Sequence, residues 1–459
     1  MITAKGIVLL IFILSFVLIL SEKLHRSIAA WLGCVLMLFT GHATGVFSLA
    51  DGHSLEHEML TWIEFEVIGL LLGMMVFAGL LEISGFFEFV AVKATKMSKG
   101  DPWLLVVYLG TLTTLLSLVI DNVTAIIIIA PITLKICRKM EISAIPPLLA
   151  EAILSDTGGV ASMVGDPPNV MIAAAAHDQG GELANMFGFN GFLLHLGILT
   201  LLAWVATLGY MRWYYREYLT NKPDNIESVL EENEWDMVED LRLMKTTLFL
   251  LAITVVGFSV TELLHLGIEI HAIALAGAGL ALAFARPEDN EMRDGLMHSV
   301  TEKIEWAALL FFAGLFMLVG AVGNVGYLGK LADWIFVTFG SNQVMLAVAV
   351  VWVSAIASAL IDNIPFTAAM IPVIISIGEN NPDVDIAPLF WALAMGAGFG
   401  GNATPIGSSA NVMTVSISER GPEPISTKEW LKVGLPVMII TCCVATIFIV
   451  LFHGFYSSV

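Results

Sequence analysis

Long apolar stretches separated by short polar connections run along almost the whole chain. A helix needs roughly 20 apolar residues to cross about 30 Å of hydrocarbon, so we interpret these stretches as membrane spans, two of them interrupted by polar residues. The spans cover residues 7–20, 27–40, 63–81, 147–176, 191–211, 246–263, 271–285, 304–322, 387–417 and 430–453. The pattern predicts an all-α polytopic membrane protein.

Two further apolar blocks, residues 103–137 and 344–377, are too long for one crossing and too short for two full ones. We interpret each as a re-entrant hairpin that enters and leaves on the same side. This interpretation puts every Lys and Arg except Lys5 and Lys330 on one face of the membrane. Since Lys and Arg mark the cytoplasmic side, we expect that face in the cytoplasm and both termini outside.

The chain repeats itself. The stretch "IEFEVIGLLLGMMVFAGLLEISGFF" begins at residue 63, and the similar "IEWAALLFFAGLFMLVGAVGNVGYL" begins 241 residues later, at residue 304. "IDNVTAIIIIAP" and "IDNIPFTAAMIP" are separated by the same distance, and "GDPPNVM" and "GSSANVM" by 242 residues. Several matching blocks at one period indicate a duplicated architecture.

Each half contains five predicted crossings and one hairpin, and because five is odd the second half has to insert upside down. Two inverted-topology repeats are a common plan of secondary transporters. We predict the first repeat in residues 1–211 and the second in residues 246–459, joined by a charged cytoplasmic linker in residues 212–245.

One predicted crossing in each half is a broken helix. Pro167 and Pro168 remove two backbone donors and disfavour helical geometry before them, so the span over residues 147–176 has to break. Its counterpart is the span over residues 387–417. Non-helical backbone at membrane depth is tolerated only where protein or a wet cavity covers it. We therefore expect each break to meet the hairpin tip of its own half near the membrane centre.

Acidic residues lie in these apolar segments. An ionised carboxylate at the bilayer centre costs about 2.5–3.5 kcal/mol on insertion scales, and we place Asp121, Asp166 and Asp362 there, with no Lys or Arg at comparable depth. Bound Na⁺ or a proton is then expected to neutralise them, since carboxylate and amide oxygens suit hard cations. Asp156 and Glu151 on the first broken span are candidates for a proton relay.

The two sites are predicted to differ, because Ser408 stands where the first repeat has Asp166. We expect Na⁺ at Asp121, Asn122 and Asp166 in the first site. Two structural alternatives stay open: the Asp-Asn pairs as turns or helix caps, and the Gly-Asp-Pro-Pro segment as a simple kink.

Composition changes the picture little. Hydrophobic residues make up 57% of the 459 residues, and the net charge of −20 argues against nucleic-acid binding. The four cysteines form no metal-binding pattern. We expect no cofactor beyond Na⁺ or H⁺ as coupling ion, and as partners a small inorganic ion and the lipid bilayer.

The segments "IDNVTAIIIIAPITLKI", "LLAEAILSDTGGVASMVGDPPNVMIA" and "IDNIPFTAAMIPVI" with "GGNATPIGSSANVM" resemble the ArsB/NhaD group of the ion-transporter superfamily. Within it they are most similar to the arsenical-pump-like and melanosomal P protein-like permeases with a citrate transporter-like domain. The resemblance implies a homodimer and two binding sites between hairpin tips and broken helices. The first site would contain Asp121, Asn122, Thr124, Gly165, Asp166 and Asn169, and the second Asp362, Asn363, Thr367, Gly407, Ser408 and Asn411.

We therefore expect a secondary active transporter in a bacterial inner membrane that moves a small inorganic ion or its neutral acid, coupled to H⁺ or Na⁺ by alternating access. The substrate could be arsenite or another small anion, and Na⁺/H⁺ antiport is the main alternative. A passive channel and an intramembrane enzyme using paired aspartates are less consistent with twin Asp-Asn motifs.

Overall fold

The computed structural model describes residues 3–21, 23–49, 53–218, 233–285, 287, 290–339 and 342–458, and within them all regular secondary structure is helical. Seven helices are long and apolar enough to cross a membrane, so the chain is a multi-pass membrane protein, as predicted. They are α2 (Arg26–Thr44), α4 (Phe65–Ile83), α11 (Phe189–Tyr214), α13 (Leu241–Leu263), α16 (Trp306–Asn324), α18 (Gln343–Leu360) and α22 (Thr427–Leu451). Residues 219–232 of the predicted linker lie outside the described residues.

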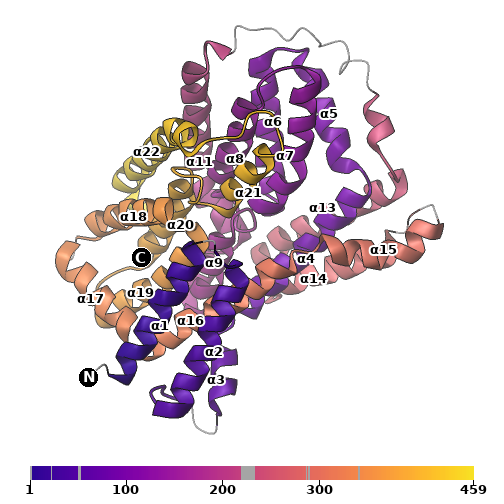
Figure 1. Ribbon diagram of the computed structural model, residues 1–459. Helices are drawn as coiled ribbons and strands as arrows, with labels where there is room; N and C mark the ends of the chain where they lie inside the picture. Colours follow the sequence, from indigo (N-terminus) through magenta and orange to yellow (C-terminus); the bar gives the residue numbers. More distant parts are fainter. Residues whose placement is uncertain are drawn as a thin grey trace.

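Shorter helices complete the two halves (Figure 1). In the first half they are α1 (Ala4–Leu20), α3 (Leu55–Thr61), α5 (Phe86–Ser98), α6 (Pro102–Ser117), α7 (Asn122–Lys139), α8 (Ile145–Gly159), α9 (Pro167–Gln179) and α10 (Gly181–Met186). In the second half they are η2 (Glu234–Met237), α14 (Ile270–Phe284), α15 (Asn290–Lys303), α17 (Tyr327–Phe339), α19 (Asn363–Asn380), α20 (Ala387–Gly401), α21 (Ser409–Ser418) and η3 (His453–Phe455).

The order of helices is the same in both halves. Helices α4 to α7 correspond to α16 to α19, and the first residues of each pair are separated by the period of the sequence motifs. For example, α4 begins at Phe65 and α16 at Trp306, while α7 begins at Asn122 and α19 at Asn363. Helices α8 and α9 correspond to α20 and α21 with the slightly longer separation of the Gly-Asp-Pro-Pro motif and its counterpart. The period of the motifs is therefore also the period of the helices that carry them.

The hairpins and breaks follow from local sequence. The α6–α7 turn ends at Asp121, whose side chain accepts from the backbone of Thr124 and caps α7. Asp362 caps α19 by accepting from the backbone of Ile364. Helix α9 begins at Pro167, because a proline is favoured in the first helical turn, where a missing N–H leaves no bond unmade. Residues 160–166 separate α8 from α9, and residues 402–408 separate α20 from α21.

Glycine allows the central helices to approach closely. A Cβ atom on Gly158 of α8 would lie 2.2 Å from Thr114 Cγ2 of α6, and one on Gly400 of α20 would lie 2.5 Å from the Ala355 Cα of α18. These contacts bring each hairpin against the broken helix of its own half. Every residue of α20 is buried, as are nearly all those of α8.

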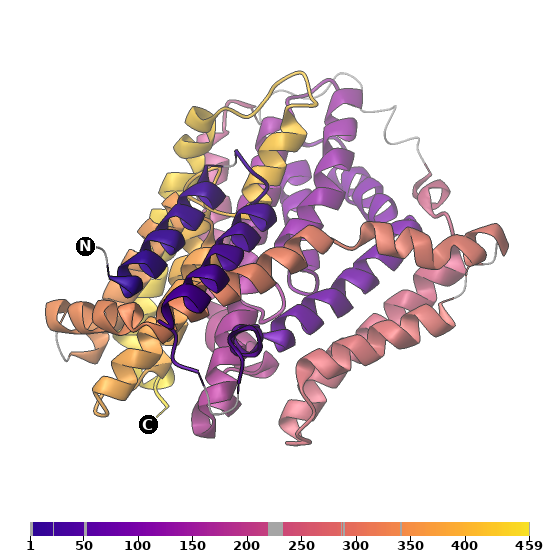
Figure 2. The ribbon, with the colours of Figure 1, turned by 60° about the horizontal axis from the view of Figure 1, so that its bottom comes forward.

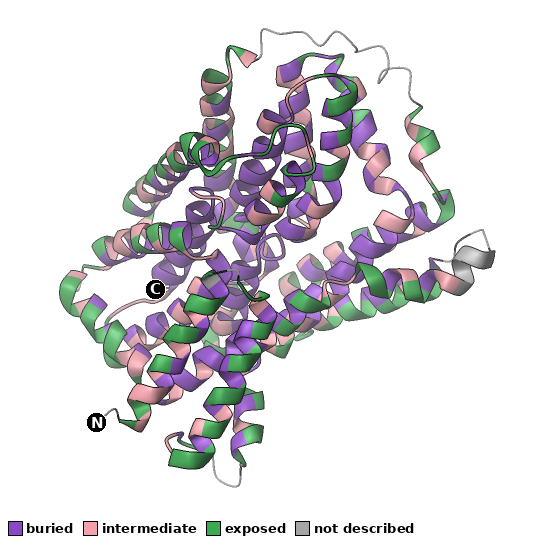
Figure 3. Cartoon of the chain, viewed as in Figure 1, coloured by how far each residue is buried: buried purple, intermediate pink, exposed green. Residues whose placement is uncertain are grey.

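The two halves pack against each other through their outer helices. Helix α2 of the first half packs against α16 of the second, and α14 of the second packs against α4 of the first. Figure 2 shows α1 and α2 lying side by side with α16 on one flank, while α13 and α14 extend along the other. Buried residues concentrate at the centre, and the outer helices carry exposed positions (Figure 3). Many of these are large and apolar, such as Ile198 and Phe249, as a lipid-facing surface requires.

Candidate functional site

Two buried carboxylates from the first broken helix form the centre of the candidate site. Asp156 lies near the end of α8 and is 2% exposed, and Asp166 immediately precedes α9 and is 1% exposed. The amide of Asn122, the first residue of α7, donates to Asp156 Oδ1 at 2.9 Å and to Asp166 Oδ1 at 3.5 Å. The Asn122 amide at the hairpin tip thus donates hydrogen bonds to both carboxylates of the break.

The second half contributes the remaining partners. Asn363, the first residue of α19, donates to both oxygens of Asp166, at 3.2 and 3.4 Å. Ser408, immediately before α21, donates to Asp156 Oδ1 at 3.2 Å. The two predicted sites are therefore joined, since one hydrogen-bonded network contains the Asn of both hairpin tips. We call Asn122, Asp156, Asp166, Asn363 and Ser408 the central network.

No basic side chain neutralises this network. Within the described part of the chain, no Lys or Arg nitrogen lies within 4.0 Å of the carboxylate of Asp156 or Asp166. Asp156 Oδ2 is buried and has no hydrogen-bond partner among these residues. Burying a charge is costly unless it is paired. The amide and hydroxyl donors reduce that cost but carry no positive charge, so the arrangement suits a mobile proton or metal cation.

Asp362 has a different environment, which corrects one prediction. We expected no basic residue at the depth of the three aspartates. Arg26, the first residue of α2, instead places Nη1 3.7 Å from Asp362 Oδ2. Arg26 also donates to the hydroxyl of Ser409, which in turn donates to Asp362. The expectation fails because the start of α2 packs against the second half, a contact between halves that the sequence period does not reveal.

Asp121 lies beside the central network, and its described hydrogen bonds stay within its own helix. It accepts from the backbone and the hydroxyl of Thr124, at 3.0 and 2.6 Å. It also lines a small cavity of about 20 Å³, together with Arg26 and Glu305. A cavity of that size holds about one water-sized species. Among the residues predicted for Na⁺, Asn122 and Asp166 are in contact, and Asp156 takes the place next to them that we assigned to Asp121.

The other predicted residues shape the breaks. Asn169 donates to the carbonyls of Gly159, Val160 and Ser162, and Asn411 donates to those of Gly401 and Thr404. These amides satisfy carbonyls that the broken helices leave without helical partners.

Gly165 and Gly407 allow close backbone contact. A Cβ atom there would lie 2.3 Å from the carbonyl oxygen of Ser117 and 2.5 Å from that of Gly401, respectively. Thr367 is buried, and its hydroxyl has no partner among the described residues.

The two relay candidates are placed differently. Asp156 belongs to the central network, whereas Glu151 is fully buried in α8 and accepts from the hydroxyl of Thr133 on α7. Glu151 Oε2 has no partner among the described residues. No direct contact joins these two acids in the described part of the chain, so a relay between them stays a prediction.

Sequence reasoning missed three residues near the site. Asn402, at the end of α20, is fully buried, and its amide donates to Thr157 Oγ1 of α8 at 3.1 Å. Asn402 lies inside the "GGNATP" motif. The sequence signal that could have identified it is an amide residue next to a predicted helix break. Arg26 and Ser409 had no such signal, because their partner Asp362 is distant in sequence.

Comparisons with known proteins agree with the architecture. The sequence pattern of the family described as "Citrate transporter" matches residues 16–396. The chain is 32% identical over 446 residues to a 46 kDa membrane protein of Mycobacterium leprae, covering 96% of this chain and 97% of that protein. It is 33% identical to an uncharacterized transporter of Mycobacterium tuberculosis strain H37Rv, covering 96% of each.

Two further likenesses are more distant or partial. The chain is 32% identical to the human P protein, covering 95% of this chain but 59% of that longer protein. Among solved structures, the YdaH transporter of Alcanivorax borkumensis matches with a TM-score of 0.60 at 15% identity, covering 94% of this chain and 99% of that one. At this identity the match speaks for the fold alone.

Proposed function

Because the chain belongs to the citrate transporter family, we propose that it is a secondary active transporter which moves a small inorganic ion or its neutral acid across the membrane. Transport would be coupled to H⁺ or Na⁺ and proceed by alternating access. One observation carries the proposal: Asp156 and Asp166 are buried together, share the amide of Asn122, and have no basic partner in the described part of the chain.

The coupling ion follows from the charge of the central network. Two carboxylates that share one amide repel each other, and leaving both ionised in the membrane would cost several kcal/mol. A proton shared between them, or Na⁺ held by their oxygens, removes that cost. Carboxylate oxygens are hard ligands, so softer metal ions are less suited to the position.

The substrate has to bind close to the negative charge of the central network. Citrate, named in the family's description, carries carboxylates that would be repelled by Asp156 and Asp166 unless cations bind first. A neutral solute such as arsenous acid, or a small anion that enters after the cation, avoids this repulsion. Arsenite-like solutes and sodium-coupled small anions are therefore the substrate classes we propose.

The second candidate is a Na⁺/H⁺ antiporter, in which the central network binds either ion in turn. The Asn122 amide shared by Asp156 and Asp166 favours it, since two neighbouring acids can exchange a proton for a cation. A passive channel is less consistent with amides from both halves binding a single buried carboxylate.

We further propose a place in a bacterial inner membrane, with both termini outside, residues 212–245 inside and the protein active as a homodimer. The asymmetry of Lys and Arg supports this orientation. A single added cysteine near either terminus should then react with a membrane-impermeant maleimide in intact spheroplasts. Reaction only after lysis would reverse the orientation.

Flux into proteoliposomes tests the function. Acid-loaded vesicles containing a pH dye should recover their internal pH on addition of either Na⁺ or arsenite, depending on the coupling. We expect Asp166→Asn to lower the initial rate at least 100-fold. The matched control is Asp333→Asn, an exposed aspartate of α17 that accepts from Asn380. Unchanged flux in Asp166→Asn would contradict the proposal, and conductance far above carrier turnover would indicate a channel.

A further inference from the structure

A second polar region lies away from the central network, in a cavity of about 450 Å³. The cavity lies between α4, the end of α9, α10 and the connection from α13 to α14. Its charged or titratable lining residues are Glu66, His177, Glu262, His265, Glu269 and His271. His177 lies near the end of α9, about 16 Å along the helix from Asp166 at the usual helical rise. The cavity also reaches Met163 in the first break.

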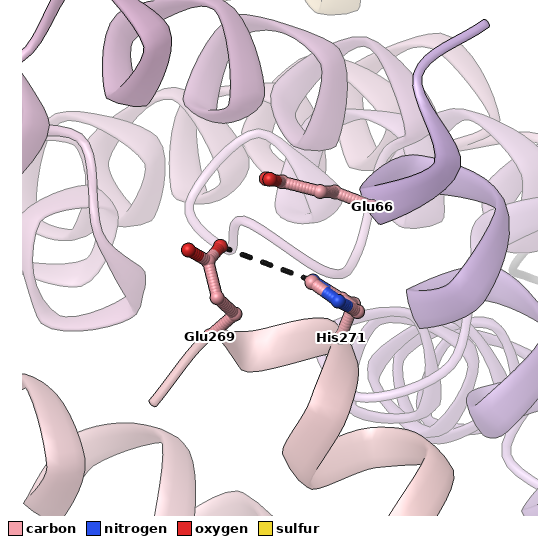
Figure 4. A group of neighbouring side chains, drawn as sticks. All are labelled: Glu66, Glu269 and His271. Atoms are coloured by element: carbon pink, nitrogen blue, oxygen red, sulfur yellow. Dashed lines mark ion pairs between the residues drawn. The ribbon is translucent and has the colours of Figure 1, made fainter. Parts of the chain in front are cut away.

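Three of these side chains converge on one point. Glu66 comes from the first turn of α4, Glu269 immediately precedes α14, and His271 lies in the first turn of α14. One ligand atom from each lies within 4.8 Å of the other two. Figure 4 shows the three side chains around a common space, with Glu66 approaching from a helix and Glu269 from the segment that leads into the helix of His271. We call Glu66, Glu269 and His271 the vestibule cluster.

A fourth ligand is close by. His177 Nε2 lies 3.3 Å from Glu269 Oε1, and His271 Nδ1 lies 3.9 Å from Glu269 Oε2. Glu66, in contrast, has no hydrogen bond or ion pair among the described residues. Both imidazoles lie within ion-pair distance of Glu269, while the Glu66 carboxylate faces the same space.

The chemistry of these ligands indicates the ion. Imidazole nitrogen with carboxylate oxygen is a typical donor set for Zn²⁺, which takes three or four such ligands at about 2.0–2.2 Å. Mg²⁺ prefers six oxygens in octahedral geometry. Separations up to 4.8 Å are somewhat wider than a tetrahedral site needs, and the half-exposed side chains can close that gap by rotation.

We propose that the vestibule cluster, together with His177, binds one Zn²⁺ or similar divalent transition-metal ion from the cavity. The ion joins α4 of the first half to α14 of the second and, through His177, to the end of α9. Zn²⁺ binding should then stabilise the folded protein by mass action.

The test is metal binding by the purified full-length protein in detergent, measured by competition with a chromogenic Zn²⁺ chelator. Wild type should bind one Zn²⁺ per chain, and Co²⁺ in its place should give the visible absorption of a tetrahedral site. Glu66→Gln and His271→Gln should each raise the Kd at least tenfold. His177→Gln gives a third variant should either of these fail to fold, as judged by gel filtration.

The matched control is the pair His42 and Glu56, whose side chains lie 2.7 Å apart and belong to no group of three possible metal ligands among the described residues. His42→Gln should leave the Kd for Zn²⁺ unchanged. The added Zn²⁺ should raise the Tm of wild type and of His42→Gln but not of Glu66→Gln. The proposal is overturned if the cluster variants bind Zn²⁺ as tightly as wild type, or if Mg²⁺ competes at equal concentration.

Discussion

Arg26 at the start of α2 and Asp362 at the tip of the second hairpin form an ion pair 3.7 Å long, bridged by the hydroxyl of Ser409. The pair connects the first half of the chain to the second. It also divides the acids of the site into two classes: Asp362 lies beside a basic side chain, whereas Asp156 and Asp166 have no basic partner among the described residues. In the proposed function, it is the second class that binds the coupling cation.

Replacing Arg26 alone should therefore lower the Tm more than replacing Arg26 and Asp362 together. Arg26→Gln leaves Asp362 partly buried without its cation, whereas Arg26→Gln with Asp362→Asn removes both charges. We expect the double variant to regain Tm relative to Arg26→Gln alone, with a coupling free energy of about 0.5–3 kcal/mol. A double-mutant cycle of thermal unfolding in detergent measures it, and strict additivity would show that the ion pair contributes nothing.

Ser408→Asp should make the second break acidic like the first. Ser408 donates to Asp156 Oδ1, so a carboxylate in its place would add a third negative charge to the central network. We expect a lower Tm at pH 8 than wild type and a smaller difference at pH 5, since protonation relieves the repulsion. Ser408→Asn keeps a donor and serves as the control. A difference in Tm independent of pH would indicate a steric effect instead.

Gly158→Ala should separate α8 from α6. Its methyl group would lie 2.2 Å from Thr114 Cγ2, and overpacking of this kind costs about 1–3 kcal/mol. Thr114→Ser removes that methyl group, so the double variant should recover most of the Tm. Gly209→Ala in α11, where a Cβ meets nothing within 4 Å, should be neutral or stabilising. A Gly158→Ala protein as stable as wild type would mean that the two helices can move apart.

Asp385 should make the end of the chain sensitive to acid. Burial raises its pKa, but hydrogen bonds from Ser457, from the backbone of Ala387 and from Ser458 outweigh burial, so the net pKa is lowered. An acid with a lowered pKa stabilises the folded state above its ordinary value near 3.9, and this contribution is lost as the pH falls through the lowered value.

Hydrogen exchange of residues 453–458, measured by mass spectrometry, checks this prediction. After correction for intrinsic exchange, wild type should keep protection of this segment above about pH 4 and lose it progressively as the pH falls below that value. Asp385→Asn should show weak protection throughout. Asp383→Asn, an exposed neighbour two residues earlier, should behave as wild type. Equal protection in all three proteins would refute the role of Asp385.

Much of this fold could be predicted because prolines and periodic motifs constrain it directly. The paired prolines at residues 167–168 indicate a break wherever the helix lies in space, and the predicted hairpin blocks correspond to α6–α7 and α18–α19. The all-α membrane fold and the family resemblance are confirmed. These features are determined by residues that are close to one another in the sequence, so the sequence alone predicts them.

The partners within the site could not be predicted in the same way. Asp156 meets Ser408 from 252 residues away, and Arg26 meets Ser409 from 383 residues away. The duplication pairs each residue with its counterpart, but it does not say which residues touch across the two halves. Those contacts depend on which flanking helices of one half pack against the other half. The three-dimensional structure specifies this packing, and the sequence period does not.

The packing of flanking helices of one half against the other half has a consequence for biosynthesis. Helix α2 ends at Thr44 and its partner α16 begins only at Trp306, while α4 ends at Ile83 and its partner α14 begins only at Ile270. Each of these early helices therefore leaves the ribosome long before its late partner. During that interval the faces of α2 and α4 that later become buried have to be covered by lipid or by the insertion machinery. The slow, non-local step of assembly then comes only in the second half of translation. A chain truncated before α16 would leave the face of α2 uncovered and therefore open to quality-control proteases.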